Sequence, residues 1–126
     1  MLHPKEFRVN QAWIAFRLNS SPIQTEIDGD FNCMALMDAA SCFLLGTEFF
    51  PASAAEPTQR VFRRLLKQAR SHKPQLPKKL YFSSEAVTDE MIHEATRQKI
   101  EVVRVPESEL LIFIAEARMG FNERFG

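Results

Sequence analysis

The chain has 126 residues, of which 45% are hydrophobic and 25% are charged, and its 16 Lys and Arg balance its 16 Asp and Glu. This size and composition predict a single domain over residues 1–126 and exclude a disordered chain, which lacks so many large apolar residues. No apolar run reaches the roughly 18 residues that cross a bilayer, and the charged N-terminus does not suit a signal peptide, so we expect a cytoplasmic protein without membrane contact.

The first half of the chain predicts antiparallel strands. Residues 13–18 are apolar on both faces, which is typical of a strand covered on both sides. Residues 23–27 fit either a short strand or a loop. Two longer apolar runs, 31–37 and 42–50, are separated by the small residues of segment 38–41, which predicts a β-hairpin.

The middle of the chain changes to a helical period. Residues 53–56 read Ser-Ala-Ala-Glu, the form of a capping box, and Pro57 suits a first helical turn. In the helix that follows, apolar residues share one side and basic residues the other. The apolar side holds Val61, Phe62, Leu65, Leu66 and Ala69, and the basic side holds Arg60, Arg63, Arg64, Lys67 and Arg70.

The last third of the chain alternates strands and helices. Residues 79–82 and 100–105 predict strands, Thr88 is the expected cap of a second helix, and Ser108 that of a third. The buried side of the second helix holds Met91, Ile92 and Ala95, and that of the third holds Leu110, Phe113, Ile114, Ala117 and Phe121. Antiparallel strands followed by βαβ units predict an α/β fold, with a mixed sheet and helices on its faces.

Two short motifs carry a family resemblance. Met37-Asp38-Ala39-Ala40-Ser41, followed by Leu44-Leu45-Gly46, forms an Asp-x-x-Ser turn before an apolar strand that contains Gly, and Leu80-Tyr81-Phe82-Ser83-Ser84 follows the basic helix. With the order of elements from Trp13 to about Phe121, these motifs resemble the ribonuclease H-like fold, and more closely the core domain of retroviral integrases and DDE transposases. The resemblance implies a mixed five-stranded sheet of ribonuclease H-like order with helices on both faces.

The catalytic acids of that family are mostly missing here. Its two-metal chemistry needs carboxylates that hold two cations roughly 4 Å apart. The position of the family's first Asp, three residues after a Trp, is Phe16, and that of the second is Ser84, with Glu85 beside it. Asp38 matches a turn residue of the family rather than a metal ligand. We therefore expect a fold without nuclease activity, and no metal site or cofactor.

The alternative is a divergent hydrolase or nuclease. It would act at the carboxyl end of the sheet, where open α/β sheets often bind ligands. Its candidate residues are Asp38, Ser84, Glu85, Glu109 and Glu116. This hypothesis requires those side chains to converge in one cleft.

The basic residues suggest a binding surface. Residues 60–79 hold eight Lys and Arg and no acid, so the helix carries a positive ridge although the net charge is zero. Such a ridge suits nucleic acid or an acidic protein, and it is also the ordinary solvent face of an amphipathic helix. We predict a non-catalytic binding module whose partner is either nucleic acid or another protein. Its binding residues are Arg60, Arg63, Arg64, Lys67 and Arg70.

Other residues with reactive side chains predict no site. The three histidines share no metal-ligand spacing. Pairing around the 38–41 turn places Cys33 near Gly46 and Cys42 near Met37, so we expect two free, buried thiols.

The last helix has more apolar residues than one face needs. The surplus comprises Leu111, Ile112 and Met119. Such surface marks a homodimer interface or the contact site for the rest of a longer protein. A domain that only dimerises is thus a third interpretation.

Overall fold

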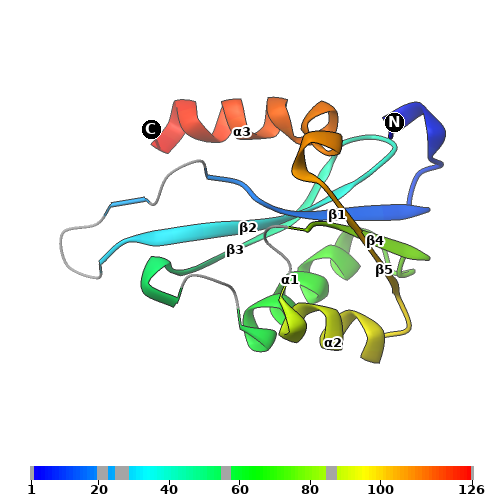
Figure 1. Cartoon of the computed structure of the whole chain (residues 1–126), viewed down its shortest axis with the longest axis horizontal. Helices are drawn as coiled ribbons and strands as arrows, with labels where there is room; N and C mark the ends of the chain where they lie inside the picture. Colours follow the sequence, from blue (N-terminus) through cyan, green and yellow to red (C-terminus); the bar gives the residue numbers. More distant parts are fainter. Residues whose placement is uncertain (1, 20–22, 25–28, 55–57, 85–87, 126) are drawn as a thin grey trace.

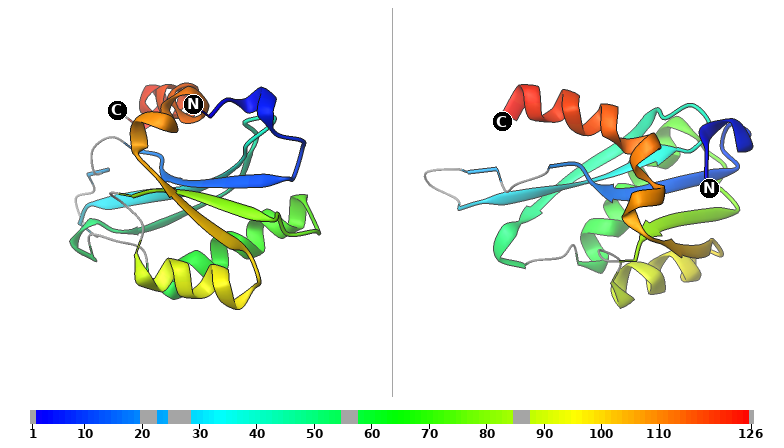
Figure 2. Two further views of the ribbon diagram at one scale, coloured as in Figure 1. Left: turned by 45° about the vertical axis from the view of Figure 1, so that its right-hand side comes forward. Right: turned by 45° about the horizontal axis from the view of Figure 1, so that its top comes forward.

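The computed structural model describes residues 2–19, 23–24, 29–54, 58–84 and 88–125. The strands are β1 (Ala12–Arg17), β2 (Phe31–Asp38), β3 (Leu44–Pro51), β4 (Lys79–Ser83) and β5 (Glu101–Val105), and the helices are α1 (Gln59–His72), α2 (Asp89–Arg97) and α3 (Leu111–Phe125). One sheet lies between α3 on one side and the pair α1 and α2 on the other (Figure 1). The turned views of Figure 2 show the same three layers.

The sheet is mixed. Its strand order is β3-β2-β1-β4-β5. The pairs β1–β2 and β2–β3 are antiparallel, and the pairs β1–β4 and β4–β5 are parallel. The predicted fold class, a five-stranded mixed sheet with helices on both faces, is therefore confirmed.

The central strand β1 contributes to two separate cores. Trp13 and Ala15 pack in the cluster beneath α1 and α2, and Ile14 and Phe16 pack in the cluster beneath α3. Successive side chains of a strand point to opposite faces, so an uninterrupted apolar run is what a strand covered on both sides requires. The prediction for this segment is confirmed.

The β2–β3 hairpin forms in a different register from the predicted one. Cys33 pairs with Phe49 rather than with Gly46, and Met37 pairs with Leu44. The strands are joined by a loop longer than the four-residue turn, and their register shifts between Leu36 and Met37, which displaces every partner along β3. Both cysteines are free, but Cys42 is only half-buried, so burial was predicted correctly for Cys33 alone.

Two of the three predicted helix caps are wrong. Thr58 caps α1, its hydroxyl oxygen accepting a hydrogen bond from the Val61 amide at 3.2 Å, whereas Ser53 lies in the 3-10 helix Ala52–Ala54. Residues 55–57, with the rest of the expected capping box, lie outside the described residues. Ser108 lies within another 3-10 helix, Glu107–Glu109. Thr88 caps α2 as predicted.

The predicted buried sides of the helices are largely confirmed. All five apolar residues of the α1 stripe are buried. In α3, Phe113 and Ile114 are buried, and Ala117 and Phe121 are half-buried; Leu110, which is also buried, lies just before the helix begins. In α2, Glu94 is buried in place of Ile92.

A glycine in β3 allows α1 to pack closely on the sheet. A Cβ atom at Gly46 would lie 2.9 Å from the Cβ of Gln68 on α1. The Gln68 amide accepts a hydrogen bond from the Thr47 backbone nitrogen at 3.2 Å and donates one to its carbonyl oxygen at 2.7 Å. The glycine thus permits the approach that these bonds then fix.

Candidate functional site

Two described residues of the enzyme hypothesis, Asp38 and Ser84, lie at opposite ends of the sheet. Asp38 ends β2 and pairs with Trp13 near the start of β1, which pairs in turn with Leu80 in β4. Ser84 follows the other end of β4. Because β2 runs antiparallel to β1, its carboxyl end lies beside the amino ends of β1 and β4. The prediction that Asp38 and Ser84 share one end of the sheet is therefore wrong.

The carboxylate of Asp38 has a structural role. The residue is 0% exposed. Its Oδ1 accepts a hydrogen bond from the Asn10 amide at 2.6 Å, and its Oδ2 accepts two from the amide and hydroxyl of Ser41, at 2.9 and 2.8 Å. Both oxygens are thus engaged in holding the hairpin loop and the segment before β1.

Glu109 and Glu116, the other described acids of the hypothesis, lie on elements that follow β5. Glu109 is half-buried in the 3-10 helix after β5, and Glu116 is exposed on α3. Glu85 lies outside the described residues, and exposed Ser84 donates its backbone amide to Val105. Within the described ranges, no three His, Cys, Asp or Glu side chains are grouped so as to hold a metal ion. The described members of the candidate set therefore do not form the group of carboxylates that two cations would need.

Arg118 of α3 packs beside Phe16, the residue at which the family resemblance implies a first catalytic Asp. Phe16 is buried there, and the Arg118 guanidinium carbon lies 6.0 Å from its ring centroid. Arg118 also donates to the Arg17 carbonyl at 3.0 Å and to Glu107 Oε1 at 2.7 Å. Arg118 thus joins α3 to β1 and to the 3-10 helix Glu107–Glu109.

The two thiols are unsuited to nucleophilic catalysis. Burial, with a smaller contribution from the charge of Glu48, raises the pKa of Cys33 to about 11. Burial is also the main cause that raises the pKa of Cys42, with the charges of Asp38 and Glu116 adding to it. The reactive thiolate is therefore scarce at neutral pH.

The side chains of the predicted basic ridge do not all lie on one surface. All five of its residues are exposed. Arg64 turns toward β3, where its Nε lies 2.6 Å from Glu48 Oε1. Arg63, Lys67 and Arg70, spaced at i, i+4 and i+7, line a groove.

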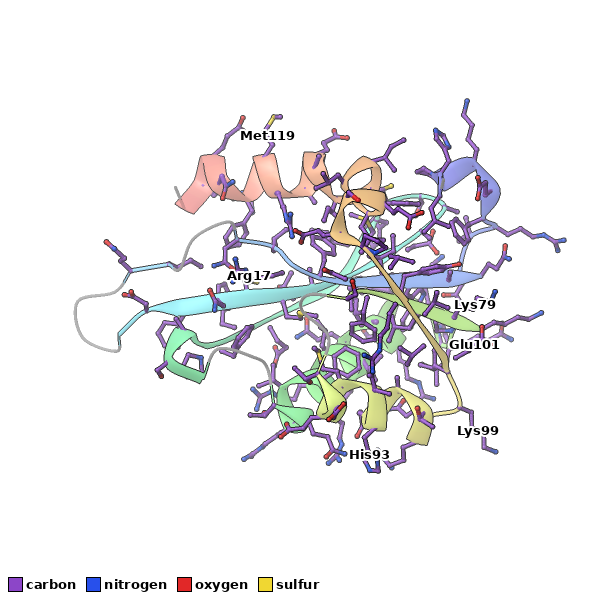
Figure 3. All side chains as sticks on the ribbon, in the orientation of Figure 1. Arg17, Lys79, His93, Lys99, Glu101 and Met119 are labelled. Carbon is purple, nitrogen blue, oxygen red and sulfur yellow. The ribbon has the colours of Figure 1, made fainter. Side chains whose placement is uncertain are left out.

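This groove, the basic groove, lies where α1 and α2 run side by side under the sheet (Figure 1). Its volume is about 620 Å³. Four of its lining residues are cationic and none is acidic, in the set Arg63, Lys67, Arg70, Ser71, Pro74, Arg97 and Gln98. The outward side of α2 carries His93, which points away from the molecule (Figure 3).

Glu94 lies beneath the basic groove and joins its two sides. The side chain is 0% exposed. Its Oε1 accepts hydrogen bonds from Arg63 Nε and Nη2 at 3.3 and 3.2 Å and from Arg97 Nε at 3.3 Å. Its Oε2 accepts from Arg97 Nη2 and Gln98 Nε2, both at 2.7 Å, and Gln59 Nε2 donates to Oε1 at 3.0 Å.

These bonds keep Glu94 ionised. The hydrogen bond from Arg97 is the largest cause that holds the pKa of Glu94 well below its ordinary value. Burial opposes this shift, and the bonds from Gln59, Gln98 and Arg63 reinforce it. Conversely, Glu94 raises the pKa of Arg97.

Sequence reasoning missed the contribution of α2 to this site. The signal was the acid at position 94, three residues after buried Met91 and next to buried Ala95, with Arg97 three residues further on. An acid within an apolar stripe indicates a buried carboxylate that needs cationic partners. Ile92 lies about 100° around the helix from Met91, at the margin of that stripe, which explains its partial exposure.

Comparison with known proteins shows the fold. No protein-family model matches the sequence, and neither does any curated protein. Among solved structures, a chain of the simian T-cell lymphotropic virus intasome in complex with PP2A regulatory subunit B56 gamma is similar, with TM-score 0.62 and 13% identity. The match covers 91% of this chain but 39% of that one.

A second group of matches is the HTLV-2 integrase catalytic core domain in complex with magnesium. Its dimeric form gives TM-score 0.60 at 12% identity, over 92% of this chain and 69% of that one. Its trimeric form gives TM-score 0.57 at 12% identity, over 91% and 68%. The chain therefore has the ribonuclease H-like fold, as the sequence predicted. Within the described residues, no helix combines the length and hydropathy of a membrane span.

Proposed function

We propose that this chain is a non-catalytic binding module that contacts a polyanion through the basic groove. The observation that carries the proposal is the lining of the groove, where Arg63, Lys67 and Arg70 of α1 meet Arg97 of α2 without an acidic neighbour in the lining set. Glu94 offsets part of the charge of two of these residues from below, so the positive charge is directed outward.

Nucleic acid is the proposed class of partner. Residues 63, 67 and 70 rise along α1 in steps of about 6 and about 4.5 Å, and such a row suits the repeating charge of a phosphate backbone. Cations that neutralise phosphates release counterions, which supplies sequence-independent affinity. The similar solved structures are named as an integrase and an intasome, which supports the same class. An acidic protein is the competing partner.

The positions of Asp38 and Ser84 at opposite ends of the sheet argue against the hydrolase or nuclease alternative. We place the protein in the cytoplasm, a proposal supported by its two free cysteines. We also propose self-association through the exposed apolar residues of α3.

The first prediction concerns the two groove cations that do not bond to Glu94. Replacing Lys67 and Arg70 together by Gln should weaken binding to short DNA and RNA about tenfold or more at low salt. The slope of log affinity against log salt should become shallower by about two, because two phosphate contacts are lost. Fluorescence anisotropy over a salt series measures both quantities.

The matched control is Arg60→Gln with Arg64→Gln, which removes the same two charges from α1 outside the groove lining. It should change affinity far less. Equal weakening by both variants would mean that only overall charge matters. Binding to polyglutamate but not to nucleic acid would replace the proposed partner by an acidic protein.

A further inference from the structure

We infer that Arg63 and Arg97, held by Glu94, form a clamp for a single phosphodiester group in the basic groove. This inference rests on the proposed function and gives its site a defined geometry. Glu94 is the positioning residue of the clamp, and the two guanidiniums are its ligand-binding groups.

The first support is the orientation of the two arginines. Each turns its Nε and Nη2 edge toward Glu94. A planar guanidinium has a second edge, formed by its two terminal nitrogens, and that edge remains for a ligand. The side chains are 54% and 53% exposed, so each arginine is bonded to Glu94 while about half of its side chain is open to solvent.

The second support is that one atom brings the two guanidiniums together. Glu94 Oε1 lies 3.2 Å from Arg63 Nη2 and 3.3 Å from Arg97 Nε. Two like charges at such close quarters repel each other unless an anion lies between them. The buried carboxylate provides that anion from below, and a phosphate would provide it from above.

The third support is the choice of residue. Arginine binds phosphate through two parallel N–H donors, and lysine binds it as a point charge. The two groove cations anchored to Glu94 are both arginines, from different helices. A pre-organised pair loses little side-chain freedom when it binds, which favours affinity.

The test separates geometry from charge. Replacing Arg63 and Arg97 together by Lys keeps both charges and removes the planar donor pairs. If the clamp exists, affinity for short single-stranded and duplex DNA falls about tenfold or more, while the salt slope stays unchanged because the number of cations is unchanged. The matched control, Arg60→Lys with Arg64→Lys, should bind like the wild type.

A second variant tests Glu94 itself. Glu94→Gln removes a negative charge, so electrostatics alone predicts tighter binding to DNA. The clamp predicts weaker binding, since the arginines lose their anchor. Glu48→Gln removes the acid that pairs with Arg64 on the other side of α1 and should bind as tightly as wild type or slightly more tightly. Thermal unfolding of each variant establishes that it is folded.

The outcomes distinguish the clamp from the function on which it rests. If the Lys pair binds like wild type while Lys67→Gln with Arg70→Gln weakens binding, the groove binds DNA and the clamp is wrong. If wild type binds no nucleic acid at low salt, both proposals fail. Should Glu94→Gln unfold, the Lys pair still decides, because its exposed side chains keep their charges.

Discussion

Asn10 holds three parts of the chain together before β1 begins. Its Oδ1 accepts a hydrogen bond from Trp13 Nε1 at 2.7 Å, its Nδ2 donates to the Gln75 carbonyl at 2.7 Å, and its amide donates to Asp38. Its φ of 66° lies in the left-handed region, which Asn enters more readily than most residues. Both its side chain and its backbone conformation are therefore used.

Asn10→Ala should destabilise the fold by about 2–3 kcal/mol. The Trp13 residue is 0% exposed, so its indole N–H would lose its partner, and alanine adds strain at positive φ. Asn10→Gly loses the same bonds without the strain and should unfold at a temperature between those of Asn10→Ala and wild type. Calorimetry measures all three. Equal stability of Asn10→Ala and wild type would contradict this role.

Residue roles of this kind were the least accessible to sequence reasoning. Asp38 and Ser41 were identified as turn residues, but the bond from Asp38 to Asn10 spans 28 positions and has no local signature. Glu94 similarly depends on Arg63, 31 positions earlier. Partners so distant are set by the packing of elements, which no short motif encodes.

At the scale of elements, α1 and α2 are joined by one buried carboxylate. A lowered pKa means that Glu94 binds its proton more weakly in the folded than in the unfolded chain. The ionised Glu94 side chain therefore contributes its full stability when the pH is above 4.5, the ordinary pKa of a glutamate. This contribution is lost as the pH falls below 4.5 toward the lower pKa of the folded state.

We expect the Tm of the wild type to fall further than that of Glu94→Gln when the pH is lowered from about 6 to about 3. The two falls in Tm should differ by about 5 °C. Glu48→Gln serves as the control for the loss of one carboxylate elsewhere on the sheet–helix surface. If Tm falls with pH equally for wild type and Glu94→Gln, the bonds of Glu94 contribute no pH-dependent stability.

The elements themselves were largely predictable, because their signals are local. The stripe of α1 and the Thr88 cap of α2 follow from spacing alone. The start of α1 was misplaced because Thr58, like Ser53, is a good N-cap, and sequence offers no way to choose between two such residues a short distance apart. The hairpin register was wrong because the loop comprises residues 39–43, with Cys42 at a φ of 59°, and because the pairing shifts between Leu36 and Met37.

At the scale of the whole molecule, α3 leaves an apolar surface uncovered. Leu111, Ile112 and Met119 are 45%, 53% and 63% exposed. Met119 points away from the sheet, on the outer side of the helix (Figure 3). An amphipathic helix covering a sheet normally presents polar residues outward, so this surface is the basis for the proposed self-association.

Ile112→Glu with Met119→Glu should convert a dimer into a monomer without unfolding it, because both side chains are exposed. Analytical ultracentrifugation over a concentration series gives the mass directly. Val9→Glu, which adds a charge at another exposed apolar residue, should leave the dimer intact. A wild-type chain that is monomeric at every concentration would rule out self-association through α3.

More of the fold than of the candidate site could therefore be predicted from the sequence. The order of strands and helices was enough to reach the ribonuclease H-like fold. The basic groove needed the relative placement of two helices, and only Arg63, Lys67 and Arg70 of its cations were foreseen. Arg118, which lies beside Phe16, was not identified because two of its contacts are with β1, about 100 positions earlier in the chain.

The shared carboxylate also limits the order in which mutations can accumulate in descendants of this sequence. Losing one arginine is tolerable, since Glu94 keeps the other. If both arginines are lost before the acid, the buried charge of Glu94 has no cationic partner. If the acid is lost first, the two arginines face each other without an anion between them. The route with the lowest cost removes one arginine and then exchanges the acid and the remaining arginine in close succession. Positions 63, 94 and 97 should consequently covary among homologues. Sequences with an arginine at position 63 or 97 should keep the acid at position 94.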